Sequence, residues 1–377
     1  MSFAFGFSGD DIDENMVIAV DSSAVAAAAA EPKPEPLQAG AFPVEGQPQL
    51  PALAHSLDDM VAALPSKVVY NTLDIVLDDG KGVVQLPRRE LWDVRVQLMA
   101  EDEVDGKSNV TEGLGTHDVK TGVYEGGFKS WESSVDLIKV LANERYGIVG
   151  PGNGYARRVM ELGCGTALPS LAIFQQALHR YIASPTTAQP TTLIMADYNP
   201  SVMQLVTLPN FLLTWALACR TSEPALSTAF SIEDEVELTD DVRAAFKQTL
   251  RAAGIQLHFL SGGWSREFVD LLYTQSPAPT EPVKSAMYGR LTLPTIIMGA
   301  ETIYSPFALK AFAATQYNIL SREAGALSLV AAKRLYFGVG GSLDDFIAKA
   351  EDDGAHIESL REETQGVVRG VVECRLS

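Results

Sequence analysis

The chain has 377 residues, of which 46% are hydrophobic, so it is long enough for one large α/β domain with appendages or for two smaller domains. Its formal net charge of −19 argues against direct binding to nucleic acid, because Lys and Arg supply most of the affinity for phosphates, and it favours basic protein partners. The three scattered cysteines include no C-x-x-C pair, so they predict neither a disulfide framework nor a zinc site and favour a reducing compartment.

Residues 1–65 are expected to form an acidic, Ala/Pro-rich and largely disordered N-terminal tail. Residues 21–55 contain EPKPEP and GQPQLP, a composition that buries too little apolar surface to offset the entropy of ordering. The starting sequence MSFAFGFSGDDIDENM lacks the basic and apolar regions of a signal peptide, and its FAFGF stretch is either a simple hydrophobic tag or a docking peptide. No run approaches the roughly 18–20 apolar residues of a membrane span. We therefore expect a soluble intracellular protein.

Structure is predicted to begin near Val68, where VVYNTLDIVL has the pattern of a strand. Residues 66–128 are assigned to an N-terminal extension that packs on the catalytic domain. Residues 130–142 predict a helix, since their apolar side chains share one face.

From residue 156 onward, predicted strands and helices alternate. ARRVMEL, TTLIMADYN, IQLHFLSGGW, TLPTIIMGAETIY and ALSLVAAKRLYFGVGG read as strands. Helical segments follow ARRVMEL, TTLIMADYN and TLPTIIMGAETIY, and the chain ends in two further strands. This alternation predicts a doubly wound, mostly parallel α/β sheet. The domain is assigned to residues 129–377, with an acidic, moderately helical insertion at about 221–254.

The loop after the first of these strands is rich in glycine: Glu161-Leu162-Gly163-Cys164-Gly165-Thr166. In such sheets ligands bind outside the carboxyl ends of the strands, and glycine lets the backbone approach them closely. A dinucleotide motif needs a third glycine where this chain has Leu168, which weakens a pyrophosphate interpretation. Asp197 ends the next strand and can accept two ribose hydroxyls. The pattern predicts a nucleoside site such as that for S-adenosylmethionine, with Glu161 facing the cationic end.

Two further strand ends fit this prediction. LSGGW, residues 260–264, offers small residues and an aromatic ring for an adenine. GAETIY, residues 299–304, places small residues, an acid and a tyrosine beside the reaction centre. The five histidines have no ligand spacing, so no metal site is predicted.

Several segments together identify a resemblance. YEGGFKSWESSVDL, MELGCGTALPS, MADYNPSVMQLVTLPN, LSGGWS, AETIY and AAKRLYFGVGGS occur in this order, and MSFAFGF and RRELWDVRVQLM precede them. They resemble the eukaryotic, fungal-type protein-histidine N-methyltransferases of the class I S-adenosylmethionine fold, over about residues 86–377 and the first few residues. The resemblance implies a Rossmann-like, seven-stranded, mostly parallel sheet with an N-terminal extension and a helical insertion.

The resemblance also implies an activity. It indicates an S-adenosylmethionine-dependent protein-histidine N-tele-methyltransferase, which modifies the ring nitrogen remote from Cβ in the L3-type protein of the large ribosomal subunit. Such an enzyme supports ribosome assembly and translation in the cytoplasm and nucleus, without metal, membrane or direct nucleic-acid contact. Two alternatives stay open: a same-fold methyltransferase for lysine or a small molecule, and a non-catalytic acidic escort of a basic ribosomal protein.

The resemblance assigns cofactor contacts position by position. Residues 130–134 would close over the methionine part, the glycine loop would contact the cofactor, the residues from Asp197 would bind ribose and the adenine edge, and LSGGW would form the adenine pocket. Ala300 stands where relatives tend to carry Ser, so only its backbone can serve. The full set is Ser130, Trp131, Glu132, Ser133, Ser134, Glu161, Gly163, Gly165, Asp197, Tyr198, Asn199, Gly262, Gly263, Trp264 and Ala300.

The choice of ring nitrogen points to catalytic candidates. Neutral imidazole has one nitrogen with a lone pair and one that carries the proton, so a group that accepts the N–H decides which nitrogen is methylated. Reaction at the remote nitrogen needs an acceptor near the proximal one. The candidates are Glu301, Tyr304 and a backbone carbonyl of residues 336–338 beginning at Tyr336. A strong general base is not required, because imidazole is a competent nucleophile near neutral pH.

Overall fold

The computed structural model describes residues 43–105, 119–120, 124–125, 127–151, 154–186, 189–279, 292–336 and 340–376. These residues all belong to one compact unit, Gln38–Ser377. The predictions for the FAFGF stretch and for most of the tail lie outside the described residues.

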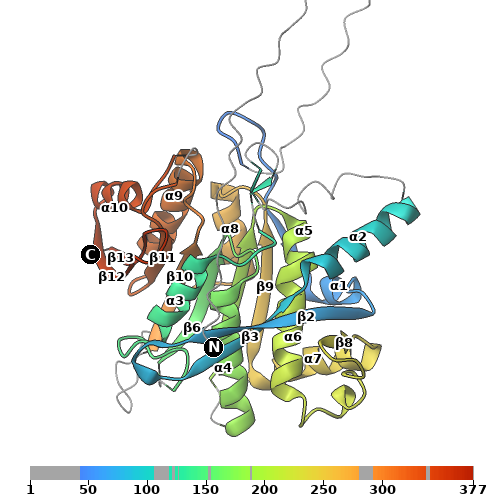
Figure 1. Cartoon of the computed structure of the whole chain (residues 1–377). Helices are drawn as coiled ribbons and strands as arrows, with labels where there is room; N and C mark the ends of the chain where they lie inside the picture. The colour runs from blue at the N-terminus through green and yellow to red at the C-terminus, as the bar shows by residue number, and fades with distance from the viewer. Residues whose placement is uncertain are drawn as a thin grey trace, which may run out of the picture. The chain divides into compact units, whose positions relative to one another are not determined.

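Within the described residues, eight strands form the main sheet in the order β1-β9-β7-β6-β10-β11-β13-β12 (Figure 1). Strands β9, β7, β6, β10 and β11 are parallel, whereas β13 is antiparallel to both β11 and β12. Chain order reverses between β6 and β10, which confirms the predicted doubly wound, Rossmann-like sheet and its terminal strand pair. The strands are β1 (Leu53–His55), β6 (Tyr155–Leu162), β7 (Thr191–Asp197), β9 (Ile255–Ser261), β10 (Thr292–Ala300), β11 (Leu327–Lys333), β12 (Ala355–Glu363) and β13 (Arg369–Leu376).

Helices cover both faces of this sheet, and the strands alternate their side chains between two hydrophobic clusters. In β6, Val159 packs into the cluster of the first face, while Met160 packs into that of the second. Strands buried on both faces read as apolar runs, as residues 193–196 of TTLIMAD do, whereas ARRVMEL also carries Arg157, Arg158 and Glu161. On the first face lie α3 (Glu132–Ala142), α4 (Leu168–Ala183), α6 (Leu208–Cys219) and α7 (Asp240–Ala253); on the second lie α8 (Arg266–Gln275), α9 (Pro306–Arg322) and α10 (Leu343–Asp352).

The N-terminal extension lies against the first face and forms, with β8 (Glu235–Glu237) from later in the chain, an antiparallel sheet in the order β3-β2-β8. The hairpin of β2 (Lys67–Val76) and β3 (Val83–Arg89), joined through a 3₁₀ turn at Asp78–Gly80, crosses α4 and α6 (Figure 1). Arg89 fixes it there: its backbone N–H donates to Asn210 Oδ1 at 2.8 Å, and its guanidinium donates to the Leu205 carbonyl at 2.8 Å. The extension continues in α2 (Leu91–Asp105) and in the short strands β4 (Val119–Lys120) and β5 (Tyr124–Glu125).

Two predicted boundaries need correction. The expected tail to residue 65 already contains β1 and α1 (Leu57–Ala62), and β1 pairs with the edge strand β9, so the main sheet has eight strands rather than seven. The segment predicted as an insertion at 221–254 divides in two. Its first part holds a 3₁₀ turn (Pro224–Leu226) and β8 (Glu235–Glu237), which pairs with β2. Its second part is α7, whose Phe246 is fully buried in the main core.

The segment Pro200–Cys219 is long and apolar enough, by length and composition, to cross a membrane. The sequence alone does not predict this run, because polar residues interrupt it. It comprises α5 (Pro200–Val202), a π-helical turn (Met203–Thr207) and α6, and its most apolar window is 83% buried inside the protein. A buried core helix passes the same test, so the finding is weak evidence for a membrane span.

The aromatic centre of the first face gives a prediction of stability. Phe211 is fully buried, with its ring centroid 5.0 Å from that of Phe174 and 6.5 Å from that of Phe259. Phe211→Ala should lower the free energy of unfolding by about 3–5 kcal/mol, because the cavity is closed by a rigid sheet and helix. Urea denaturation measures this loss. Tyr317→Ala, on the exposed side of α9, is the control and should change the free energy by less than about 0.5 kcal/mol; equal losses would contradict the assignment of the core.

Candidate active site

The loops that follow β6, β7 and β9 lie at the carboxyl edge of the sheet and are tied to one another by backbone hydrogen bonds. Gly163 and Cys164 donate their N–H groups to the Ala196 carbonyl at 2.8 and 2.9 Å. The N–H of Gly262 is shared between the carbonyls of Asp197 and Tyr198, at 3.2 Å each. These bonds place the predicted ligand-binding segments in one continuous layer beside the switch point between β6 and β10.

The glycines of the loop after β6 have a packing role within the protein. Gly163 has φ +71°, and a Cβ there would lie 2.4 Å from Thr302 Cγ2, in the loop after β10. Gly165 has φ +50°, and its Cβ would lie 3.1 Å from the Gly127 carbonyl. Any larger residue would combine backbone strain with a clash, so both glycines are needed to bring three loops together.

Asp197 lies at the end of β7, as predicted, and is 9% exposed. Its Oδ2 accepts the Gly165 N–H at 3.0 Å, and its Oδ1 accepts the Asn199 N–H at 3.1 Å. Burial raises the pKa of Asp197, and the backbone donors Asn199, Gly165 and Tyr198 oppose that rise. Each carboxylate oxygen has a further lone pair, so the group can still accept hydroxyl donors.

Glu161 has a different environment from the one predicted. It is 2% exposed and accepts both the N–H of Ser170, at 3.0 Å, and the Ser170 hydroxyl. Ser170 lies in the first turn of α4, where backbone N–H groups need acceptors. Burial raises the pKa of Glu161 to about 7, with a smaller rise from Asp197, against the lowering by Ser170. The carboxyl therefore stabilises the start of α4, and its role toward the cationic end of a cofactor stays a prediction.

Residues 130–134 join the glycine loop to the loop after β10. Ser130 Oγ and Thr166 Oγ1 are 3.1 Å apart, and the Ser133 hydroxyl donates to the carboxylate of Glu301. Trp131 is the N-cap of α3. Within α3, Asp136 accepts a hydrogen bond from Arg369 at 2.8 Å, which fixes the helix against β13. The segment is thus held at both ends over the carboxyl edge of the sheet.

Glu301 is the centre of a second polar cluster. Its backbone is left-handed, with φ +59°, a costly conformation for a residue with a side chain, and its N–H donates to the Ala331 carbonyl at 2.9 Å. The Tyr336 hydroxyl donates to Oε2 of Glu301 at 2.6 Å, so both carboxylate oxygens accept a hydroxyl. Lys333 Nζ lies 5.0 Å from the ring centroid of Trp131 and 5.6 Å from that of Tyr336.

Opposing effects act on the ionisation of this cluster. Burial raises the pKa of Glu301, whereas the charge of Lys333 and the hydroxyl donors Ser133 and Tyr336 lower it. The pKa of Tyr336 is raised well above its usual value by burial and by the neighbouring carboxylate, so Tyr336 remains a hydroxyl donor. Glu301 is consequently a buried acceptor whose position and rotamer are fixed by its neighbours.

Three buried polar atoms at this edge have no hydrogen-bond partner: Gln49 Oε1, Trp264 Nε1 and Thr302 Oγ1. All three belong to residues that pack on the glycines described above or on Gly263. A Cβ on Gly163 would lie 3.6 Å from Trp264 Cη2 and 2.4 Å from Thr302 Cγ2, and one on Gly263 would lie 3.1 Å from Gln49 Cβ. Buried polar atoms normally take part in a hydrogen bond, so these three atoms are available to a bound molecule. Together with Asp197 they fit a small polar molecule such as a nucleoside.

The other predicted site residues are placed as follows. Tyr304 is half-buried against the cluster of the second face, and Ala300 pairs with Ala331 between β10 and β11. Gly262 and Gly263 lie under residues 49–52, a segment that the sequence analysis assigned to the disordered tail. Residues 337 and 338, two of the backbone candidates, lie outside the described residues. The described part of the chain contains no group of three or more metal-binding side chains.

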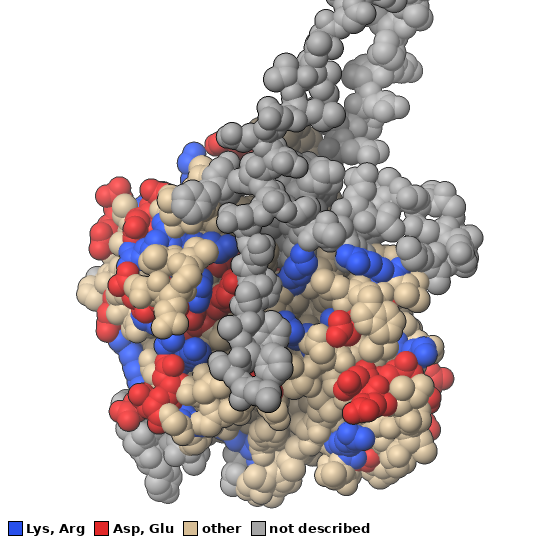
Figure 2. All heavy atoms as spheres, in the orientation of Figure 1, with Lys and Arg blue, Asp and Glu red and all other residues tan. Residues whose placement is uncertain are grey.

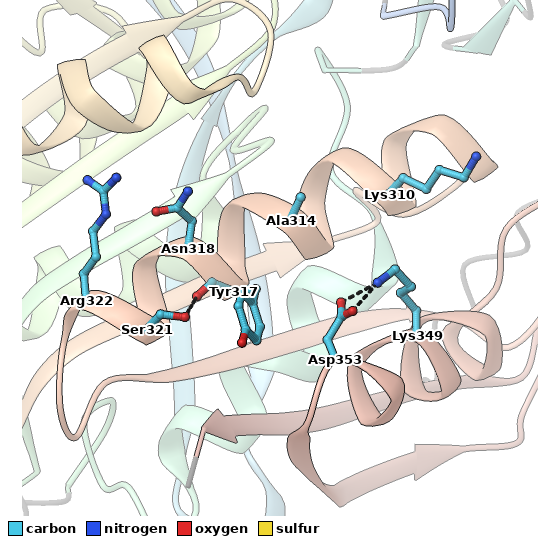
Figure 3. A pocket seen from close by; sticks show the side chains of 8 residues that line it. All are labelled: Lys310, Ala314, Tyr317, Asn318, Ser321, Arg322, Lys349 and Asp353. Atoms are coloured by element: carbon cyan, nitrogen blue, oxygen red, sulfur yellow. Dashed lines mark hydrogen bonds and ion pairs between the residues drawn. The ribbon is translucent and has the colours of Figure 1, made fainter.

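A groove of about 680 Å³ lies elsewhere, along α9 and the end of α10 (Figure 3). Its charges are largely paired: Lys349 contacts Asp353 at 2.5 Å, Arg322 contacts Asp270 at 3.6 Å and Lys310 contacts Glu45 at 3.5 Å. None of the predicted site residues lines it, so it is not the nucleoside site. Its lining residues are Lys310, Ala314, Tyr317, Asn318, Ser321, Arg322, Lys349 and Asp353.

Comparison with known proteins finds close similarity in sequence. The chain is 31% identical over 373 residues to Histidine protein methyltransferase 1 of Saccharomyces cerevisiae, covering 93% of this chain and 91% of the relative. It is 34% identical over 336 residues to the protein of the same name from Schizosaccharomyces pombe, covering 87% of each. A Bos taurus homologue is 27% identical over 64% of this chain and 53% of its own length. No family model matches.

Similarity to solved structures is weaker. A precorrin-6y C5,15-methyltransferase from Geobacter metallireducens matches with a TM-score of 0.32 and 11% identity, over 65% of this chain and 88% of that chain. A complex of LepI with SAM matches with a TM-score of 0.29 and 13% identity, over 64% and 46% of the two chains. These scores are too low to support an argument, and the fold rests on the strand order of the chain itself.

The buried carboxyl of Glu161 gives a prediction about pH. Because its pKa is raised from 4.5 to about 7 in the folded protein, its contribution to stability is fully present below 4.5 and is lost as the pH rises through 7. Glu161→Gln does not titrate and keeps an acceptor for Ser170. As the pH rises from about 4 to about 8, the free energy of unfolding of this variant should increase by up to about 3 kcal/mol relative to that of the wild type. Urea denaturation at several pH values measures the difference; a constant difference would contradict the desolvation of Glu161.

Proposed function

The chain belongs to the histidine protein methyltransferase family, and on this premise we propose that it transfers a methyl group from S-adenosylmethionine to the ring nitrogen remote from Cβ in a histidine of the L3-type large-subunit ribosomal protein. Membership follows from two yeast relatives that are more than 30% identical over most of both chains. The chain is therefore a methyltransferase. The choice of nitrogen is supported by one observation above all: the buried carboxylate of Glu301, held by Ser133 and Tyr336 beside the glycine loop.

The cofactor would be held by residues of the carboxyl edge. Asp197 would offer its carboxylate oxygens to the ribose hydroxyls. The glycine loop would let the backbone approach the cofactor closely, and Trp264 Nε1 and Thr302 Oγ1 are buried polar atoms without a hydrogen-bond partner. Residues 130–134 lie across this edge, where they would exclude water from the methionine part. S-adenosylmethionine brings an already activated methyl group, so the protein has to align the partners rather than generate a strong nucleophile.

Glu301 would orient the substrate imidazole. Its carboxylate accepts the N–H of the proximal ring nitrogen, which leaves the lone pair of the remote nitrogen facing the methyl group. S-adenosylmethionine, held by Asp197 and the glycine loop, would supply the methyl group to that nitrogen, and the electron pair of the carbon–sulfur bond would remain on sulfur. The ring is then a cation that still carries its proximal proton, and the anionic carboxylate stabilises it until the proton passes to water.

Charge supports a basic protein substrate. The net charge of the chain is −19. Exposed acidic side chains follow one another along the segment around β8, and Figure 2 shows acidic side chains gathered on that part of the surface. Such a surface raises the rate at which a basic partner is encountered. A ribosomal protein before or during assembly fits this description, with the cytoplasm and nucleus as the proposed location. These acidic residues are Glu233, Asp234, Glu237, Asp240 and Asp241.

The proposed activity is tested by incubating the protein with methyl-labelled S-adenosylmethionine and ribosomal proteins that lack the modification. Mass spectrometry of the labelled peptides should place the label on a histidine of the L3-type protein. Label on lysine would contradict the proposed target residue, and label on a different ribosomal protein would contradict the proposed substrate.

Glu301→Gln should reduce turnover by about 100-fold, because the amide can present its N–H₂ group to the imidazole and so misplace the ring. Single-turnover rates with saturating cofactor measure this effect. Glu351→Gln, an exposed carboxylate change on α10, is the matched control and should leave turnover unchanged. Full turnover by Glu301→Gln would contradict the role given to the carboxylate.

A further inference from the structure

Residues 43–55, here called the strap, lie along the carboxyl edge beside β9. The last residues of the strap form β1, which pairs with β9 so that Leu53 is opposite Ser261. His55 Nε2 is 2.7 Å from the Ser261 hydroxyl. The Leu50 carbonyl accepts the Gly263 N–H at 2.9 Å, and the Leu50 N–H donates to the Tyr198 hydroxyl at 3.0 Å. The strap is therefore attached to the two loops that were predicted to hold the adenine.

The two glycines after β9 are shaped for the strap. Gly262 has φ +104°, and a Cβ there would lie 2.2 Å from the Pro51 carbonyl oxygen. A Cβ on Gly263 would lie 3.1 Å from Gln49 Cβ and 3.6 Å from its Cγ. A side chain at either position would push against the strap. The two glycines of the LSGGW segment therefore let residues 49–51 pack directly beside the proposed adenine pocket.

Gln49 is held in one orientation by its own segment. Its side-chain nitrogen donates to the carbonyls of Val44, at 2.8 Å, and Gln47, at 2.9 Å. These two bonds use both of its N–H groups. The amide oxygen is buried and has no partner, although a buried acceptor of this kind normally has one. The side chain thus presents a fixed, unused acceptor beside Gly263.

We propose that Gln49 is a specificity residue whose amide oxygen accepts a hydrogen bond from the exocyclic amino group of the cofactor's adenine. This proposal rests on the proposed function, because it presupposes an adenosyl cofactor at this edge. The exocyclic amino group is the donor that adenine offers on its edge, and a 6-oxo base presents an acceptor there instead. A site built around such a hydrogen bond rejects the analogue that lacks the donor, since the buried acceptor is then left unpaired.

The test compares the binding of two thioether nucleosides, S-adenosylhomocysteine and S-inosylhomocysteine, by isothermal titration calorimetry. The wild type should prefer the adenosyl compound by about tenfold or more, the effect of one unpaired buried acceptor. Gln49→Met has nearly the same shape and lacks the acceptor. It should bind S-adenosylhomocysteine about tenfold more weakly and lose most of the preference.

Gln47→Met is the matched control, because the Gln47 side chain is exposed and only its carbonyl contacts Gln49. It should keep the preference of the wild type. An unchanged preference in Gln49→Met, with a melting temperature like that of the wild type, would overturn the role of Gln49 while leaving the proposed function intact. Failure of the wild type to bind S-adenosylhomocysteine would instead overturn the cofactor assignment, and the inference with it.

Discussion

The carboxylate of Glu301 is the interaction on which the arrangement of the site depends. It joins α3, the end of β10 and the segment after β11, since Ser133 and Tyr336 both donate to it. The left-handed backbone of Glu301 is costly, and the hydrogen bond from its N–H to the Ala331 carbonyl helps to hold it. The carboxylate attaches residues 130–134 to the reaction side of the sheet, while the contact between Ser130 and Thr166 attaches them to the glycine loop.

Much of the fold could be predicted from sequence because its strands are buried on both faces. TTLIMAD contains the apolar run of residues 193–196, and the helices between the strands leave few alternatives to a doubly wound sheet. Asp197 and the glycine loop were recognisable for the same reason, since both follow directly on such a strand. Chain order alone then placed them at one edge.

Other features depend on contacts that no local pattern records. Gln49 lies in a Pro- and Gln-rich stretch whose composition is typical of disorder, yet backbone hydrogen bonds and two shape-selected glycines order it. Glu161 looked like a cofactor ligand, but its partner is Ser170, nine residues along the chain. Ser133 and Glu301 are 168 residues apart, so their contact appears only once the sheet is assembled. In each case tertiary packing, rather than local preference, decides the outcome.

The central claim is that a fixed carboxylate chooses the nitrogen that is methylated. The most direct test is to transfer ¹³C-methyl from S-adenosylmethionine to the substrate histidine and to identify the methylated ring nitrogen by heteronuclear NMR. The account predicts methylation of the remote nitrogen alone by the wild type, and a share of proximal methylation by Glu301→Gln. Exclusive remote methylation by both proteins would contradict it.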